Sequence, residues 1–181
     1  MQKTIVFYSS SKEYGEFSNL FPAEITFNGR KWKSVEHIYQ YLKINPANKD
    51  WAEWLITAPE TKLVAMAGHG LSPYKKYLRD NWDDIKRPIM RYLVALKYSQ
   101  NQSLGDLLRK TGGAMIIEDS KYDSYWGRGE DGTGDNVLGV LLMELRVVLS
   151  RQYELQSDVM EIWIEHLETH PIIAKILSEL I

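Results

Sequence analysis

Three polar side chains of this sequence are spaced so that they project from one face of a predicted helix. Glu36, Gln40 and Lys43 stand at positions i, i+4 and i+7 after Ser34, and residues at these spacings share a helical face. A carboxylate, an amide and an amine that point together are typical of a catalytic face. The same spacing fits a solvated face with a favourable Glu-to-Lys arrangement, so both interpretations stay open at this point.

A glycine-rich segment at residues 121–136, KYDSYWGRGEDGTGDN, is the second candidate, and its composition argues against both helix and strand. Residues 127–132 match the GxGxxG pattern, but no buried strand precedes them and few residues follow, so we reject a Rossmann fold. The glycines would instead let backbone amides turn toward a phosphate near Asn136, where a helix begins. A surface loop with Asn136 as a helix N-cap is the alternative.

Asp123 and Trp126 lie in this segment, just before its glycines. A carboxylate beside an indole suits an oxocarbenium-like ribosyl transition state next to a stacked base. Such a pairing also arises by chance, and the residue types alone do not decide between the two. We keep Asp123 as a candidate catalytic residue and Trp126 as a candidate stacking residue.

Four further polar residues are weaker candidates. Ser18 and Asn19 form either a polar turn or hydrogen-bonding groups for a ribose or a base. Lys97 and Glu118 are single charges near apolar segments, which fits either paired burial or contact with a substrate. The four histidines show no spacing typical of a metal site, so we expect no metal and no other cofactor.

The elements that must position these residues are mostly helical. Apolar runs at residues 4–8 and 24–27, the second ending at the turn Asn28-Gly29, predict short strands. Apolar residues after Ser34, a good N-cap, repeat with helical spacing as far as Asn45. Further helices are predicted at residues 48–57, 60–67, within 83–99, at 102–110 and 137–151, with about two more in 152–181, separated at His170-Pro171. We therefore predict a mainly α chain with a small β element, in the α+β class.

The composition limits the classes of protein. A chain of 181 residues with 44% hydrophobic composition has room for one sizeable core, which predicts a single domain. Its net charge of -2 creates no global field for a polyanion, so any nucleotide recognition must come from a local patch. The absence of cysteine excludes disulfides and cysteine nucleophiles. No apolar run is long enough for a signal peptide or a membrane helix, so we expect a cytoplasmic protein with no membrane partner.

Several segments resemble, in order, the blocks of the NADAR family. The likeness extends over roughly residues 5–150, and several blocks in the right order are more specific than any one of them. The segments are Phe7-Tyr8, EFSNLFP at 16–22, GRKWKSVEHIYQYLK at 29–43, NW and IM within 81–90, LKY at 96–98, TGG and IIEDS within 111–120, YDSYWGRG at 122–129 and GDNVLGVLLMELR at 134–146.

This resemblance implies a compact, mainly helical domain with a small strand element, which we place at residues 1–150, with residues 151–181 as a helical extension packed on the same domain. It also implies hydrolysis of N-glycosidic bonds. Members of the family act on ribosylamine intermediates of riboflavin synthesis. Others remove ADP-ribose from the amino group of guanine in nucleic acid, and some of these are antitoxins to DNA-modifying ADP-ribosyltransferases. We expect ADP-ribosylated guanine as the substrate, a toxin ADP-ribosyltransferase as a partner, and a phosphorylated ribosylamine as the alternative substrate.

The resemblance also implies a set of site residues. The family pattern matches at Glu36, Lys43, Asp123, Trp126, Gly127, Gly129, Asn136 and Gly139. We take Glu36, Lys43 and Asp123 as catalytic. Substrate binding is expected from Ser18, Asn19, Trp82, Lys97, Glu118, Trp126, Gly127, Gly129 and Asn136. The chain departs from the family at Gly68-His69-Gly70, where Gly-Arg is common, and at Lys97-Tyr98, where Lys-Phe is common, so its grip on phosphate is expected to differ.

Two chemical routes use these residues. In the first, the N-glycoside opens to an imine and the amine of Lys43 displaces the base, forming a Schiff base that water hydrolyses. This route requires Lys43 to be partly desolvated. In the second, Glu36 or Asp123 activates water while the other protonates the leaving nitrogen. In both routes Trp126 is expected to stack on the base or ring, with Asn19 and the glycine-rich segment holding ribose and phosphate.

Two rival functions remain at this stage. In one, the protein is a non-catalytic nucleotide-binding module, in which Trp126 and the glycine-rich segment bind ADP-ribose while Lys43 only pairs with Glu36. In the other, the C-terminal helices are the main functional feature and hold a protein partner such as a toxin. Single substitutions of the carboxylate and the amine separate the first rival from an enzyme, and deletion of residues 152–181 tests the second.

Overall fold

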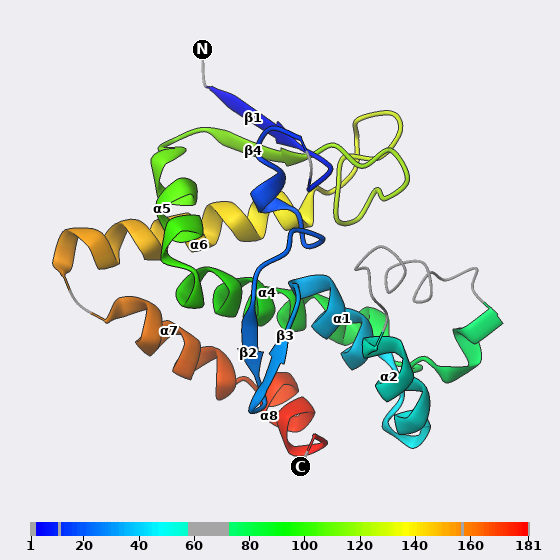
Figure 1. Ribbon diagram of the computed structural model, residues 1–181. Helices are drawn as coiled ribbons and strands as arrows, with labels where there is room; N and C mark the ends of the chain where they lie inside the picture. Colours follow the sequence, from blue (N-terminus) through cyan, green and yellow to red (C-terminus); the bar gives the residue numbers. More distant parts are fainter. Residues whose placement is uncertain (1–2, 11, 58–72, 157, 181) are drawn as a thin grey trace. The chain divides into compact units, whose positions relative to one another are not determined.

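The computed structural model describes residues 3–10, 12–57, 73–156 and 158–180 (Figure 1). The chain divides into two units, and each is built from two separate stretches of sequence. The first unit comprises Met1–Phe21 with Asn101–Trp163, and the second comprises Pro22–Gln100 with Ile164–Ile181. The predicted helix at residues 60–67 and the segment Gly68-His69-Gly70 lie outside the described residues.

The first unit contains a two-stranded parallel sheet. Strand β1 (Thr4–Phe7) pairs with β4 (Met115–Glu118), and Ile5 lies opposite Ile116. Both of these side chains are buried, which is expected of a strand with one face against a core. Strand β4 is not predicted from the sequence, because a four-residue run is too short to show a period and its partner is more than a hundred residues away in the chain.

One helix of the first unit packs directly on this sheet. Helix α6 packs against both β4 and α5 (Figure 1). The helical elements of the unit are η1 (Gly15–Phe17), α5 (Gln102–Lys110), α6 (Val137–Leu155) and the first half of α7 (Val159–Glu168). The predicted helices at 102–110 and 137–151 are confirmed, although α6 runs four residues further than predicted.

The second unit begins with a tight antiparallel hairpin. Strands β2 (Ile25–Phe27) and β3 (Arg30–Trp32) flank Asn28 and Gly29, whose φ angles are 48° and 69°. Positive φ at both central positions is typical of a type I′ turn, the geometry that matches the twist of the two strands. The turn predicted at Asn28-Gly29 is confirmed.

Helix α1 (Val35–Lys43) follows this hairpin and starts at the predicted N-cap. The Oγ of Ser34 accepts a hydrogen bond from the N–H of His37 at 3.4 Å and lies 3.0 Å from His37 Nδ1. This contact satisfies one of the backbone donors that are left over at a helix start. Ser34 and His37 are both buried, so the histidine next to Glu36 has a structural role.

Helix α4 is the element on which two other helices of the second unit pack. Helices α1 and α8 both contact α4, and the ring of Phe27 on the hairpin lies 6.3 Å from Tyr92 of the same helix. The elements are η2 (Pro46–Asn48), α2 (Lys49–Ile56), η3 (Pro73–Tyr77), α4 (Trp82–Gln100), the last part of α7 and α8 (Pro171–Ser178). Pro88 lies inside α4 and has no N–H to donate to the preceding turn. The buried apolar residues of α4 stabilise the helix in spite of this loss.

A hydrogen bond attaches the end of α7 to α4. Tyr92 Oη donates to Glu168 Oε1 at 2.6 Å. Burial raises the pKa of Tyr92 above its ordinary value, and the hydrogen bond to Glu168 acts in the same direction. Two C-terminal helices separated at His170-Pro171 are therefore confirmed, with Pro171 as the first residue of α8. No helix among the described residues is long and apolar enough to cross a membrane.

The close approach of α6 to β4 gives a testable prediction. A Cβ added to Gly139 would overlap the carbonyl oxygen of Ile116 and the side chain of Asn136. We expect Gly139→Ala to lower the free energy of unfolding by about 1–3 kcal/mol, because the helix must shift to admit the methyl group. Gly113→Ala is the matched control, since a Cβ there meets nothing within 4 Å. Equal melting temperatures for the two variants, measured by circular dichroism, would contradict the close contact.

Candidate functional site

Helix α1 carries the most distinctive group of polar side chains. Gln40 Nε2 donates to Glu36 Oε1 at 2.8 Å, so the predicted shared face is occupied by an oriented carboxylate and amide. Gln40 is 6% exposed, and no donor in the described part of the chain reaches its buried Oε1. Glu36 and Lys43 are half-buried. This face is therefore partly removed from water and is not an ordinary solvated surface.

A carboxylate of α4 lies within electrostatic reach of Lys43. A hydrogen bond from Lys86 and the charge of Lys86 lower the pKa of Asp83, and the charge of Lys43 lowers it further. Asp83 is therefore a charged group near Lys43 that comes from another element of the second unit.

The end of α1 that carries Lys43 is fixed by Arg79. The N–H of Arg79 donates to the carbonyl of Lys43 at 3.0 Å, and its Nε donates to the carbonyl of Leu42 at 2.7 Å. Arg79 Nη1 also lies 2.6 Å from Glu179 Oε2 near the C-terminus. Two of the carbonyls left over at the end of α1 are thus satisfied, which holds the backbone of Lys43 in place.

Two predicted binding residues of α4 are buried. Trp82 is 6% exposed and lies edge-to-face against Tyr39, with ring centroids 4.9 Å apart. Lys97 is 1% exposed, with its Nζ 5.2 Å from the centroid of the Tyr98 ring. Trp82 thus packs in the core of the second unit, and binding roles for Trp82 and Lys97 remain predictions.

The glycine-rich loop of the first unit is organised by Asp123. Its Oδ1 accepts hydrogen bonds from the N–H groups of Tyr125 at 2.9 Å and Trp126 at 2.8 Å. Its carbonyl accepts from Gly129, which has a φ of 70°. One oxygen of the predicted catalytic carboxylate is thus used to form a turn. Trp126 is half-buried, and its ring lies edge-to-face against Tyr125, 4.8 Å away.

The amides that were expected to meet a phosphate are already bonded within the first unit. At the start of α6, the N–H groups of Asn136, Val137 and Leu138 donate to the carbonyls of residues 127, 125 and 126 at 3.0, 3.0 and 3.1 Å. These three amides are therefore not available to a phosphate, whereas the binding roles of Gly127, Gly129 and Asn136 remain predictions. The backbone of the loop folds back onto the helix start and satisfies the same donors that a phosphate would need.

Asn136 stands at the N-cap position of α6, the alternative given by the sequence, but its side chain does not cap the helix. It has a φ of 49° and makes no side-chain capping bond. Instead, its Oδ1 accepts from the N–H of Glu118 at 2.9 Å and its Nδ2 donates to the carbonyl of Ile116 at 2.8 Å. The amide thus pairs with the edge of β4 as a neighbouring strand would, which is a tertiary contact that competes with capping.

Gly127 and Glu118 lie at the same junction. The N–H of Arg128 donates to the Glu118 carbonyl at 2.9 Å, and a Cβ on Gly127 would come within 2.9 Å of that carbonyl oxygen. Arg128 Nε also lies 2.5 Å from Asp119 Oδ1. The structure therefore brings Glu118, Asp123, Trp126, Gly127, Gly129 and Asn136 together as one hydrogen-bonded assembly, as their sequence proximity suggests.

Ser18 and Asn19 follow η1 in the first unit. Ser18 is buried, its N–H donates to the carbonyl of Gly15 at 3.0 Å and its Oγ accepts from the N–H of Leu20 at 3.2 Å. The polar-turn interpretation is confirmed for Ser18. Asn19 is half-buried. A ribose-binding or base-binding role for these two residues remains a prediction.

The sequence analysis missed three residues that shape the α1 face. Gln40 was noted by its spacing but not taken as a site residue, although its position four residues after Glu36 was a usable signal. Arg79 bonds to the end of α1 and Asp83 acts on Lys43 only through its charge, and nothing in their local sequence indicates either interaction. No group of histidines and acids that could hold a metal ion occurs among the residues that the structure describes.

The fold and this polar helix face define the class: a mainly helical α+β domain with a carboxylate, an amide and an amine on one partly buried helix. The family model described as NADAR domain matches residues 6–150. N-glycosidase YbiA of Escherichia coli is 38% identical over 151 residues, which covers 83% of this chain and 91% of that protein. Riboflavin biosynthesis protein VVA0006 of Vibrio vulnificus is 35% identical over 146 residues, covering 81% of this chain and 38% of that protein.

A solved structure supports the same conclusion. The NMR structure of the E. coli protein YbiA aligns with a TM-score of 0.72 and 36% sequence identity, over 84% of this chain and 89% of that chain. This similarity confirms the predicted α+β fold class. The chain belongs to the NADAR domain family.

The role of Asp123 in the turn leads to a second prediction. Asp123→Ala removes the acceptor of two backbone N–H groups, so we expect the free energy of unfolding to fall by about 1–3 kcal/mol. Asp123→Asn keeps an Oδ1 acceptor and is expected to change stability by less than about 1 kcal/mol. Thermal and urea denaturation of both variants test this difference. If the two substitutions are equally destabilising, the charge of Asp123 matters to the fold more than its acceptor geometry.

Proposed function

We infer that this protein is an N-glycosidase, which hydrolyses the bond between a ribose C1 and a nitrogen. Membership of the NADAR domain family and the N-glycosidase named among its relatives support the reaction type. The observation that carries the assignment within the structure is the α1 face, where Glu36 and Lys43 flank a buried amide. A carboxylate, a hydrogen-bonding amide and an amine supply the acid, base and nucleophile that the reaction needs.

The helix geometry suits a sugar held between the two charged groups. Glu36 and Lys43 are seven residues apart, which corresponds to about 10 Å along the helix axis. Both side chains are long enough to reach toward a ligand the size of a ribose from opposite ends. Gln40 lies between them, and its hydrogen bond to Glu36 orients that carboxylate.

In the Schiff-base route, Glu36 takes the proton of Lys43 and the sugar opens to an imine at C1. The neutral amine of Lys43 adds to C1, a C–N bond forms, and the bond to the base nitrogen breaks as that nitrogen gains a proton. Water then adds to the lysine imine, releases the sugar as an aldehyde that closes again, and restores the Lys43 amine. No oxidant, reductant or metal takes part in these steps.

In the direct route, the C1–nitrogen bond breaks through an oxocarbenium-like state that water attacks. Glu36 is then the base that activates water. Asp123 is the other carboxylate indicated by the sequence, but its Oδ1 already accepts two backbone hydrogen bonds. We therefore assign Asp123 to the organisation of the glycine-rich loop and Trp126 to stacking. Asp123→Asn keeps the Oδ1 acceptor of the turn but cannot act as an acid or a base. Full activity of this variant therefore supports a role in the loop alone.

We propose ADP-ribose on the amino group of guanine in nucleic acid as the substrate, with an antitoxin role against a DNA-modifying ADP-ribosyltransferase in the cytoplasm. A second candidate substrate is a phosphorylated ribosylamine precursor of riboflavin, which the name of the Vibrio relative favours. Both substrates contain the same type of bond. They differ in what lies beyond the ribose, so a direct comparison of the two distinguishes them.

The rival role as a holder of a protein partner is less well supported. Residues of the C-terminal region already bond to other parts of the second unit, through Tyr92 to Glu168 and through Arg79 to Glu179. The second of these bonds supports the end of α1 next to Lys43. Stabilisation of the catalytic helix explains these contacts without any external partner.

A cleavage assay with both substrates gives the third prediction. The protein is incubated with an oligonucleotide bearing ADP-ribose on guanine and with the phosphorylated ribosylamine, and release of the sugar is followed by mass spectrometry. We expect cleavage of the oligonucleotide, and we expect Glu36→Ala and Lys43→Ala each to lower the rate by about 10²–10⁴-fold. Glu24→Ala and Lys31→Ala are matched controls, because these residues form an exposed ion pair at 2.7 Å.

The possible results are distinct. Cleavage of the ribosylamine alone would replace nucleic acid by a small metabolite as the substrate. No cleavage of either compound would leave a non-catalytic binding module as the better description. Equal rates for the wild type and both α1 variants would remove the α1 face from the mechanism.

A trapping experiment gives the fourth prediction. A hydride donor such as cyanoborohydride, added during turnover, reduces a lysine imine to a stable secondary amine. We expect the adduct on the peptide that contains Lys43 and its absence from Lys43→Arg. Continued turnover of the wild-type protein with no adduct on that peptide would establish the direct route instead.

A further inference from the structure

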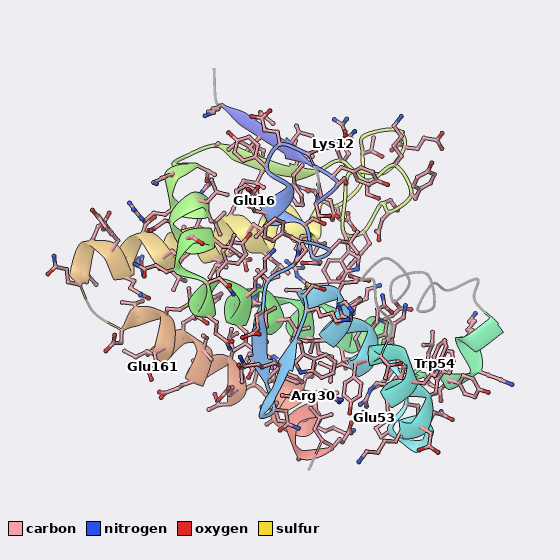
Figure 2. All side chains as sticks on the ribbon, viewed as in Figure 1. Lys12, Glu16, Arg30, Glu53, Trp54 and Glu161 are labelled. Carbon is pink, nitrogen blue, oxygen red and sulfur yellow. The ribbon has the colours of Figure 1, made fainter. Side chains whose placement is uncertain are left out.

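Three aromatic rings form a short column in the second unit. Trp51 and Trp54 on α2 stack with ring centroids 4.5 Å apart and an angle of 21° between their planes. Tyr77 of η3 lies 5.7 Å from Trp51 at 36°. Trp54 ends the column and is 57% exposed, and Figure 2 shows it on α2. An exposed indole at the end of a stack offers a face on which another flat ring can stack.

A hollow of about 530 Å³ opens beside this column. That volume falls within the range of about 300–1,000 Å³ that is usual for small-molecule sites. We call it the aromatic groove. Its walls are formed by Ala47, Asn48, Lys49, Asp50, Trp51, Trp54 and Tyr77.

Lysines surround the aromatic groove. Lys49 lines the groove, and Lys75 and Lys76 lie on η3, the element that supplies Tyr77. All three side chains are exposed. The Nζ of Lys76 lies 5.0 Å from the centroid of the Tyr77 ring, within the range of a cation–π contact. Flat rings bordered by ammonium groups fit a ligand that carries both aromatic bases and phosphates.

The acidic residues of α2 only partly oppose these lysines. Asp50 lines the aromatic groove and contributes one negative charge. Glu53 lies 3.1 Å from Arg30 of β3, as an ion pair whose two partners are labelled in Figure 2. The charges of that pair cancel, and Lys49 and Asp50 balance among the residues that line the groove, so the positive charge beside the groove comes from Lys75 and Lys76 of η3. A local group of ammonium ions of this kind is what nucleic-acid binding by a nearly neutral chain needs.

The aromatic groove adjoins the end of α1. The N–H of Asn45, two residues after Lys43, donates to the carbonyl of Tyr77 at 2.8 Å. Lys43 is in turn tied to Arg79, two residues after Tyr77, by the bond from the Arg79 N–H to its carbonyl at 3.0 Å. The backbone segments that border the groove are therefore bonded to those that position the proposed catalytic amine.

We propose that the aromatic groove binds single-stranded nucleic acid, with one base stacked on Trp54 and the phosphates next to Lys49 and Lys75. The role of this strand as the carrier of the ADP-ribosylated guanine rests on the proposed function. A strand fits better than a free nucleotide for two reasons. The column contains three rings, with centroids 4.5 and 5.7 Å apart, and the lysines lie on two elements, so that more than one phosphate can be contacted. An apolar protein partner would have to cover three ammonium groups, which is unfavourable.

The test measures binding of a fluorescent, unmodified single strand of about ten nucleotides, within the usual site size of such proteins, by anisotropy. We expect Trp54→Ala to weaken binding about tenfold. The double variant Lys49→Glu, Lys75→Glu, which changes two exposed side chains, should also bind less tightly. Its affinity should fall less steeply as the salt concentration rises. Tyr153→Ala is the matched control, since Tyr153 is 65% exposed with Arg109 3.9 Å from its ring, and its binding should equal that of the wild type.

Equal affinity of the wild type, Trp54→Ala and the double lysine variant would overturn the proposal. So would wild-type affinity for adenosine monophosphate equal to that for the strand, because the groove would then be a mononucleotide site. The readout needs no cleavage, so weakened binding without hydrolysis of either substrate would remove the proposed function alone. Hydrolysis of the modified oligonucleotide with an unchanged KM in Trp54→Ala would remove the aromatic groove alone.

Discussion

The side chain of Asn136 makes the interaction on which the first unit most depends. Strand β1 occupies one edge of β4, and the Asn136 amide covers the opposite edge through Ile116 and Glu118. A buried strand edge must have its backbone groups paired. Because this pairing comes from the residue immediately before α6, it also holds the helix start against the strand, and Gly139 provides the space for that approach.

This arrangement decides what the glycine-rich loop does. Once α6 is held against β4, the loop carbonyls meet the first amides of the helix, and Asp123 closes the turn before Trp126. The hydrogen bonds of the loop therefore fix the backbone at Trp126 and use the first amides of α6. In the second unit, α1 has the complementary role: Arg79 fixes its end and Gln40 orients Glu36, so the proposed acid–base and nucleophilic groups stand on a regular helix. Preorganised groups on a regular helix are better placed for catalysis than groups on a loop.

The α1 face and the aromatic groove have different parts in the function that we propose. The NADAR match and the α1 face support the type of bond that is broken. The aromatic groove is proposed to bind the strand to which the modified base belongs. The groove lies on a segment that joins the end of α1 to α4, so variation there can change the substrate while the reaction stays the same.

The sequence by itself determined the features that depend on near neighbours. The cap at Ser34, the turn at Asn28-Gly29 and the shared face of Glu36 and Lys43 all follow from local backbone geometry and fixed helical spacing. Tertiary structure alone decided the pairing of β1 with β4, the approach of Arg79 to α1 and the contact of Tyr77 with Trp51. It also changed Asn136 from an expected cap into a partner of β4. These contacts join segments far apart in the chain, and their free energy comes from burial and hydrogen-bond satisfaction, which no local pattern records.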